Sequence, residues 1–262
     1  MNTNIRVLSL GAGVQSSAML LMALDGAFGE APDFALFADT GWEPSEVYQW
    51  LDRLEKEVAP FKITRVSHGN IREDSISGQS RTGRFVTLPC FIDNPISGDK
   101  GMGRRQCTNE YKLNPMRRYL RSLGVKQAEM WIGISTDEAI RMKPSRLKWI
   151  THRWPLIEKK LSRESCANYL RDRMGTVAPR SSCIGCPLHN DAYWIRMKHL
   201  NPEEFEDACQ FDEQIRHAGR MKFPQYLHSS LKPLRQVSFA HEHQNRMFFD
   251  HFGNECEGIC GT

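Results

Sequence analysis

Cysteine spacing is the clearest chemical signal in the chain. Cys183 and Cys186 are separated by two residues in the segment CIGCP (183–187). Thiolates at this spacing can bind one metal ion or cluster, or act as a redox dithiol. Cys107 lies upstream, directly after a segment rich in Arg and Gly, and could supply a third thiolate. The interpretations in order are an iron–sulfur cluster, a zinc site with His189 nearby, and free thiols in a core.

Two further cysteines, Cys256 and Cys260, stand in FGNECEGICGT (252–262). A thiolate beside basic side chains has a lowered pKa and is an activated nucleophile. The pair could instead form a disulfide or bind metal, or the segment could be a flexible chain end.

Glycine and serine cluster where a buried strand should end, in VLSLGAGVQSSAML (7–20). Gly11 and Gly13 would let the backbone approach a phosphate closely, and Ser16 and Ser17 could cap a helix or donate to an anion. The segment is neither a dinucleotide fingerprint nor a Walker A loop. Taken alone, it is equally compatible with a structural turn.

A second polar strand end favours a binding site. Asp39, Thr40 and Gly41 follow the apolar run of the next expected strand. Ligands of parallel sheets bind where strands end and helices begin. Two glycine-containing ends on one edge therefore predict a nucleotide or phosphate site.

The hydrophobic periodicity alternates between strand and helix. It predicts an α/β fold with a parallel sheet, helices on both faces and a helical C-terminal part, in one domain over 1–262. From about 68 to 106 the periodicity fails, which predicts a long irregular insertion. Strands are expected at 5–10, 33–38, 61–66 and 129–134, and helices at 16–25, 43–58, 112–123, 162–173, 190–199 and 202–217.

Six segments in a shared order resemble the adenine-nucleotide PP-loop superfamily and, within it, the phosphoadenosine phosphosulfate (PAPS) reductases. Gly13-Val14-Gln15 stands where the ATP pyrophosphatases of the superfamily have Gly-Lys-Asp. The resemblance implies an adenine nucleotide alpha hydrolase-like fold, with Ser9, Gln15, Gly133 and Arg141 at the nucleotide. The segments are 7–20, 37–54, 107–120, 131–142, 153–158 and 183–187.

The resemblance also bears on the cysteines. Relatives with a [4Fe–4S] cluster have an upstream Cys-Cys pair, whereas Gln106 precedes Cys107 here. Three thiolates would leave one iron open; alternatively Cys90, Cys256 or Cys260 supplies the fourth ligand. The tail is similar to the Glu-Cys-Gly segment whose cysteine attacks sulfate sulfur in sulfonucleotide reductases.

Arginines next to these segments are candidates for phosphate or sulfate contacts, because guanidinium binds such anions through paired hydrogen bonds. Arg104 and Arg105 precede Cys107, and Arg141 follows a strand that the resemblance places at the nucleotide. The loop at Gly13 lacks the Lys and Asp of the pyrophosphatases. This argues against ATP cleavage, since charge on a leaving pyrophosphate must be neutralised.

Three functions remain open from the sequence. The first is a PAPS or APS (adenylyl sulfate) reductase that uses a thioredoxin-type reductant. The second is an Fe–S-dependent sulfur transferase that consumes ATP and modifies DNA or tRNA. The third is a nucleotide-binding regulatory module without catalysis, which the many cysteines disfavour.

Composition argues against a membrane-spanning or a secreted protein. With 40% hydrophobic and 25% charged residues among 262, the chain can bury a substantial core. No apolar stretch reaches the roughly 20 residues of a membrane helix, and no signal-peptide pattern opens the sequence, so a cytoplasmic location is expected. A net charge of +4 suits anionic small molecules and permits nucleic acid.

Overall fold

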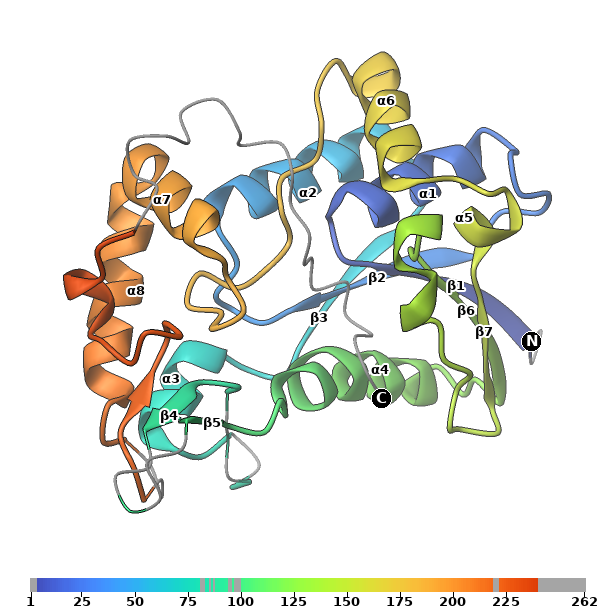
Figure 1. Cartoon of the computed structure of the whole chain (residues 1–262). Helices are drawn as coiled ribbons and strands as arrows, with labels where there is room; N and C mark the ends of the chain where they lie inside the picture. Colours follow the sequence, from blue (N-terminus) through green and yellow to red (C-terminus); the bar gives the residue numbers. More distant parts are fainter. Residues whose placement is uncertain are drawn as a thin grey trace.

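A five-stranded parallel sheet forms the centre of the protein, with strand order β3-β2-β1-β6-β7 (Figure 1). The computed structural model describes residues 4–80, 83–84, 86, 88–93, 96, 100–218 and 222–239. The α/β fold expected from the sequence is confirmed. The strands are β1 (Asn4–Leu10), β2 (Phe34–Asp39), β3 (Ile63–Ser67), β6 (Gln127–Ile132) and β7 (Ile150–Arg153).

Helices cover both faces of this sheet (Figure 1). Side chains of β1 alternate: Leu8 and Leu10 enter the core beneath one helical layer, while Val7 enters the core on the opposite face. The first layer comprises α1 (Val14–Leu24), α2 (Ser45–Glu57) and α6 (Arg163–Met174). On the opposite face lies α4 (Asn114–Ser122), which continues from a π-helical segment, η1 (Thr108–Leu113).

The segment expected to be irregular, 68–106, contains three regular elements. The helix α3 (Ile71–Ser77) begins at Asn70, whose side chain accepts from two backbone amides of its first turn. The strands β4 (Phe91–Asp93) and β5 (Lys100–Met102) pair with each other. Strands of three residues are too short to show periodicity, which is why the sequence missed them.

The C-terminal part adds a second layer of structure beside the main sheet. It contains α7 (Asp191–Leu200), α8 (Pro202–Ile215), β8 (Gln225–Tyr226) and η3 (Leu234–Gln236). β8 pairs with β4, which completes a small antiparallel sheet of order β5-β4-β8. Between β6 and α6 run η2 (Thr136–Arg141), β7 and α5 (Pro155–Glu158).

A separate apolar core joins the insertion to the C-terminal helices. Trp42 follows β2 and packs against Phe211 of α8, with ring centroids 4.4 Å apart. Trp194 and Cys209 are buried in the same core, and Cys166 of α6 is buried in the core of the main sheet, as the sequence predicted for them. Within the described part of the chain, no helix has the length and apolarity needed to span a bilayer.

We expect Gly185→Ala to destabilise this second core. A Cβ at Gly185 would lie 2.1 Å from Cη2 of the buried Trp42 side chain. Overpacking of this kind costs about 1–3 kcal/mol, so the midpoint of thermal unfolding should fall. The control is Gly101→Ala, whose Cβ would meet nothing closer than Ile92 at 3.9 Å. Equal midpoints for the two variants would contradict the tight packing at Gly185.

Candidate functional site

Three strand ends meet at one rim of the main sheet. β1 lies between β2 and β6, with Leu10 opposite Phe37 on one side and Ser9 opposite Ile132 on the other. All three strands are parallel, so the segments that follow them lie next to one another. The structure therefore brings the glycine loop, residues 39–41 and Gly133 to the same edge.

The serines of the loop make internal hydrogen bonds. Ser16 Oγ accepts from the backbone amide of Gly11 at 3.1 Å and lies 3.4 Å from the carbonyl of Gly13. Ser17 Oγ accepts from the indole of Trp50 at 2.9 Å. Both serines are buried, and neither hydroxyl caps α1, whose N-cap residue is Gly13. Their role in the structure is to hold the loop in shape.

Gln15 links the loop to the segment after β6. Its side chain is fully buried, and its amide nitrogen lies 3.2 Å from Glu138 Oε2. Its amide oxygen accepts from Arg163 at 2.9 Å. Arg141 forms an ion pair with Glu138 in η2, and Gly133 is buried between β6 and η2. Arg141 thus lies close to the loop, and its contact with a nucleotide stays a prediction.

The end of β2 forms a tight turn. Asp39 Oδ1 accepts from the Gly41 amide at 2.8 Å and from the Tyr48 hydroxyl at 2.8 Å. Gly41 has a φ of 72°, and a Cβ there would lie 3.0 Å from the Asn70 Cα, so glycine is needed on both counts. Burial and the hydrogen bond to Asp39 raise the pKa of Tyr48, which stays neutral as a donor.

Three of the cysteines line one pocket next to that turn. Cys107, Cys183 and Cys186 lie around a small apolar cavity of about 30 Å³ whose lining also includes Thr40. Thr40 Oγ1 is 3.2 Å from Cys183 Sγ. The cysteine segment is also fixed by a 3.0 Å hydrogen bond from the Ile184 amide to the Trp42 carbonyl. The thiols and the loop therefore share one rim of the sheet.

A fourth cysteine lies close to this cysteine pocket. Cys90 is 1% exposed and follows Pro89, which lines the pocket. Burial raises the pKa of the Cys90 thiol, and the nearby charge of Asp212 and the neighbouring thiols Cys186 and Cys107 raise it further. In the described part of the chain, no three His, Cys, Asp or Glu side chains are placed to hold a single metal ion.

A buried ion pair that the sequence analysis missed stands beside the thiols. Glu43 Oε1 accepts from Thr40 at 3.1 Å, lies 3.7 Å from Cys183 Sγ and is 3.8 Å from Lys112 Nζ. Burial raises the pKa of Cys183 well above its usual value; Glu43 raises it further, while Lys112 lowers it. Lys112 lies in η1, and π-helical segments are often found at functional sites. The π-helix is visible only in the structure, so the sequence offered no signal for this ion pair.

Other expected residues lie around the cysteine pocket. Arg105 lines it, and both Arg104 and Arg105 are exposed. His189 Nε2 lies 3.0 Å from the Cys183 carbonyl, which takes one ring nitrogen away from metal binding. Burial lowers the pKa of His189 well below its usual value, so it is neutral. Cys256 and Cys260 lie outside the described residues.

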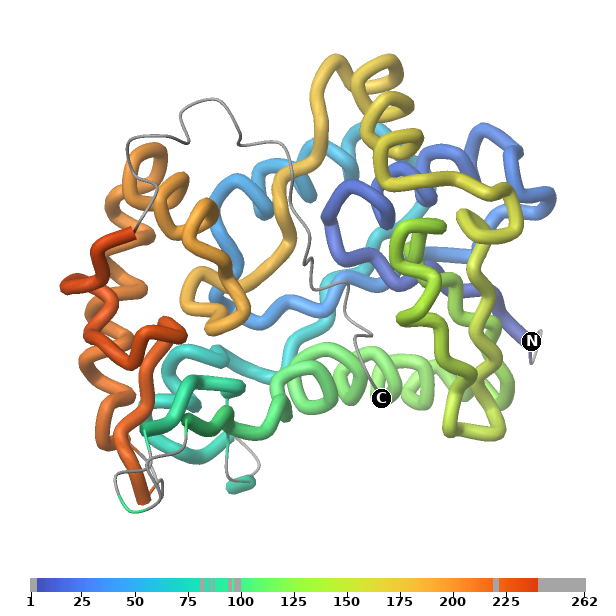
Figure 2. Tube along the Cα trace, in the orientation of Figure 1, coloured from blue at the N-terminus to red at the C-terminus, as the bar shows by residue number. Residues whose placement is uncertain are grey.

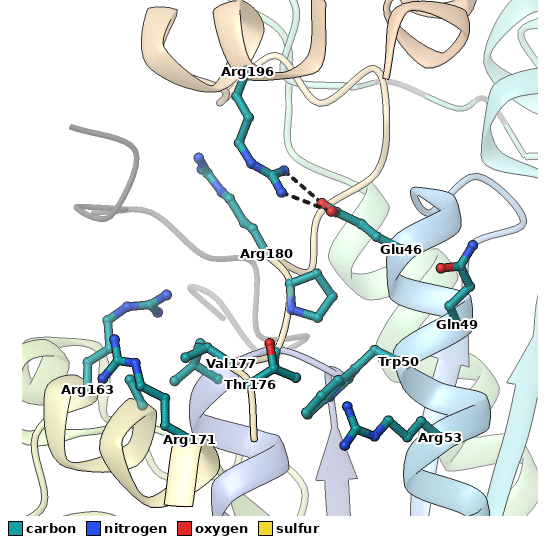
Figure 3. Close-up of a pocket in the computed structure, with 14 residues that line it drawn as sticks. Glu46, Gln49, Trp50, Arg53, Arg163, Arg171, Thr176, Val177, Arg180 and Arg196 are labelled. Carbon is teal, nitrogen blue, oxygen red and sulfur yellow. Dashed lines mark hydrogen bonds and ion pairs between the residues drawn. The ribbon is translucent and has the colours of Figure 1, made fainter. Parts of the chain in front are cut away.

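A larger hollow of about 560 Å³ lies at the start of α1, lined by side chains of α2, α6, α7 and the segment 176–180 (Figure 3). It has five arginines, which the sequence analysis did not select. They come from α2, α6, α7 and the segment 176–180, and no local pattern connects them. The arginines are Arg53, Arg163, Arg171, Arg180 and Arg196.

Comparison with known proteins agrees with this architecture. A family model described as "Phosphoadenosine phosphosulfate reductase domain" matches residues 5–159, from β1 to the end of α5. No curated protein matches the chain. The matched region covers more than half of the 262 residues and includes the loop, the end of β2, Cys107 and Gly133. The chain therefore belongs to the phosphoadenosine phosphosulfate reductase domain family.

Proposed function

We propose that the protein is an enzyme that binds an adenylyl nucleotide and carries out sulfur chemistry of the sulfonucleotide reductase type. The observation that supports this most directly is the 3.2 Å contact between Thr40 Oγ1 and Cys183 Sγ. It places the thiols next to a strand end that neighbours the glycine loop. Family membership suggests the same type of activity.

In this proposal the nucleotide lies along the rim. The loop at Gly11 and Gly13 and the first turn of α1 face its phosphate, because the first backbone amides of a helix and the positive end of its dipole favour an anion there. The turn at Thr40 and the segment at Gly133 flank the adenosine. Arg105, exposed at the cysteine pocket, is placed to contact a phosphate or sulfate.

The proposed chemistry uses a cysteine of the tail. The thiolate of Cys256 or Cys260 attacks the sulfur of the phosphosulfate. A sulfur–sulfur bond forms, the bond from sulfur to the bridging oxygen breaks, and the adenosine phosphate leaves with that electron pair. A thioredoxin-type dithiol then attacks the cysteine sulfur, releases sulfite and is oxidised to a disulfide while the cysteine thiol is restored.

The residues present suit an iron–sulfur cluster better than zinc. Cys107, Cys183 and Cys186 line one apolar pocket, and the position of Cys90 makes it the fourth candidate ligand. His189 is not among the described residues that line this pocket, so the site lacks the nitrogen ligand that the zinc alternative needs. Lys112 and Arg105 line the same pocket and would offset the negative charge of thiolate ligands. A bound cluster supplies iron that can polarise or reduce a sulfur group.

Sulfite release tests the proposed function. With PAPS or APS as substrate, thioredoxin-dependent sulfite release should occur in the intact protein. It should be lost in Cys256→Ser or in Cys260→Ser, whichever is the nucleophile. The matched control is Cys209→Ser, a buried thiol of the second core. Without sulfite release, ATP hydrolysis stimulated by DNA or tRNA would favour the sulfur transferase; full activity in both tail variants would remove the nucleophile assignment.

We expect Cys183→Ser to lower the iron content of protein purified without oxygen by at least half, together with the visible absorbance of the cluster. Cys209→Ser should retain both. Reconstitution should improve as pH rises from about 6.5 to 8.5, because burial raises the pKa of Cys183 and metal binding must release its proton. Equal iron in the two variants would contradict the proposed ligand.

We expect Ser16→Ala to weaken binding of adenosine 3′,5′-bisphosphate about fivefold, because loss of one hydrogen bond costs about 1 kcal/mol. The Gly11 amide would lose its acceptor and the loop its shape. Ser122→Ala is the control, since its hydroxyl lies 2.7 Å from the Tyr119 carbonyl at the exposed end of α4. Titration calorimetry measures both; unchanged affinity in Ser16→Ala would remove the loop from the site.

A further inference from the structure

Positive charge gathers in two segments that contain no carboxylate. Residues 111–128 and 139–157 each contain five Lys or Arg, and neither contains an Asp or Glu. The whole chain has 35 Lys and Arg against 31 Asp and Glu. The two segments therefore depart strongly from the average, and their place in the fold decides whether their charges act together.

The two segments form one surface. The guanidinium carbon of Arg121 in α4 lies 3.8 Å from the centroid of the Trp149 ring. The Ala128 amide donates to the Trp149 carbonyl at 2.9 Å, which ties the start of β6 to the residues before β7. Figure 2 shows α4 in green and the segment 142–149 in yellow-green next to each other at one side of the molecule. Their positive charges therefore add on the same side of the protein.

The segment 142–149 turns its apolar side chains inward and its cations outward. Its side chains that pack against the core beneath α4 are Met142, Leu147 and Trp149. The residues between them, Lys143, Arg146 and Lys148, are exposed. A ring nitrogen of His152 lies 2.9 Å from the Lys143 carbonyl, which holds the segment against β7. The exposed cations are thus carried by an anchored stretch of backbone.

Three lysines of this surface have no anionic partner. Within the described ranges of the chain, no ion pair involves Lys126, Lys143 or Lys148, and the same holds for Arg146. Because Ala128 pairs with Ile150 in parallel register, Lys126 and Lys148 each precede that pair by two residues and lie close together.

Two arginines of α4 contact neutral acceptors. Arg117 donates to the amide oxygen of Asn109 at 3.3 Å, and Arg121 donates to the Val125 carbonyl at 3.2 Å. A neutral acceptor orients a guanidinium but leaves its charge in place. We call these cations together the basic face; its members are Arg117, Arg121, Lys126, Lys143, Arg146 and Lys148.

The carboxylates nearest in sequence are engaged elsewhere. Glu129 accepts from the indole of Trp131, whose side chain lies in the core on the opposite side of the sheet from α4. Glu158 pairs with Arg153 at 2.9 Å. Neither therefore offsets the charge of the basic face.

We infer that the basic face binds the sugar–phosphate backbone of a nucleic acid. Its cations extend over a helix, a turn and an adjoining segment, and none of them lines the arginine hollow or the cysteine pocket. Cations spread in this way match a polymer with regularly spaced negative charges better than a single small anion. A membrane surface is disfavoured, because the apolar side chains of 142–149 pack inward and membrane binding buries such groups in lipid.

The basic face begins next to the candidate site. The segment 142–149 follows η2 directly, and Glu138 of η2 lies 3.2 Å from the side-chain nitrogen of Gln15 in the glycine loop. A nucleic acid on this face would therefore pass close to the rim that carries the loop. The inference goes beyond reduction of a small sulfonucleotide. It needs neither iron nor the tail cysteines, so binding can be measured whether or not the protein releases sulfite.

The test measures fluorescence anisotropy of a labelled 20-base-pair DNA duplex and of a labelled RNA hairpin with the full chain, between 50 and 200 mM salt. Affinity should fall steeply with salt. The double variant Lys143→Gln and Lys148→Gln should bind about tenfold more weakly at 100 mM salt. Its slope of log affinity against log salt should be shallower by about two, since each phosphate contact contributes about 0.9 to that slope.

The matched control is the double variant Lys56→Gln and Lys62→Gln, which removes the same charge. Lys56 lies at the end of α2 and Lys62 just before β3, and both are exposed. Because α2 covers the opposite face of the sheet from α4, this control should bind as the unaltered chain does. Circular dichroism verifies that both double variants keep the fold.

The two labelled probes distinguish DNA from RNA, and tighter binding of either one supports a contact with the shared backbone. Three results would overturn the inference. The first is no binding of either probe at 50 mM salt, and the second is equal affinity in the two double variants. The third is displacement of both probes by polyglutamate or by phosphatidylserine vesicles at a lower concentration of negative charge than unlabelled duplex requires, which would indicate an acidic protein or a membrane as the partner.

Discussion

The hydrogen-bonded position of β1 between β2 and β6 determines where the candidate residues lie. Parallel pairing on both sides forces the three following segments to the same rim. The short turn at Asp39 then directs Thr40 towards the cysteine segment. The 3.2 Å contact between Thr40 and Cys183 therefore depends on the register in which β2 pairs with β1. The glycine loop and the thiols thus share a rim because of backbone pairing, before any side chain is considered.

The second core holds the thiols in place and also sets their chemistry. Trp42 packs on Phe211 and leaves room for no side chain at Gly185, which fixes the cysteine segment rigidly. The same burial disfavours a free thiolate at Cys183, and Glu43 adds to the effect. Buried thiols of this kind are inert without a metal, because a cation must replace the proton. Rigidity and a raised pKa together favour a ligand over a nucleophile at Cys183, which agrees with the proposal that a tail cysteine is the nucleophile.

The sequence predicted the elements with a strong hydrophobic pattern, and it missed those held by distant partners. The observed ends of β1, β2 and α2 lie within two residues of the predicted ends. β4, in contrast, pairs with β8, which lies far along the chain, and no local pattern shows that pairing. The glycine loop and the three pocket thiols were found because their residue types are unusual. Ser16 and Ser17 were predicted to cap the helix or to donate to an anion. In the structure neither caps α1, and their oxygens accept from Gly11 and Trp50, partners that no local pattern reveals. The tail cysteines remain a prediction.

The arginines of the hollow show why a missing motif residue is weak evidence for a missing function. From the sequence, the absence of the Lys and Asp of the pyrophosphatases in the loop argued against ATP cleavage. Folding, however, brings guanidiniums from α2, α6 and α7 to the first residue of α1. Electrostatic neutralisation depends on distance and burial and does not require that the charges come from one segment. A net charge of +4 is modest for the whole chain, yet five arginines are among the described residues that line one hollow. The charge balance of a site is therefore a property of the fold, and the loop sequence alone is an incomplete guide to it.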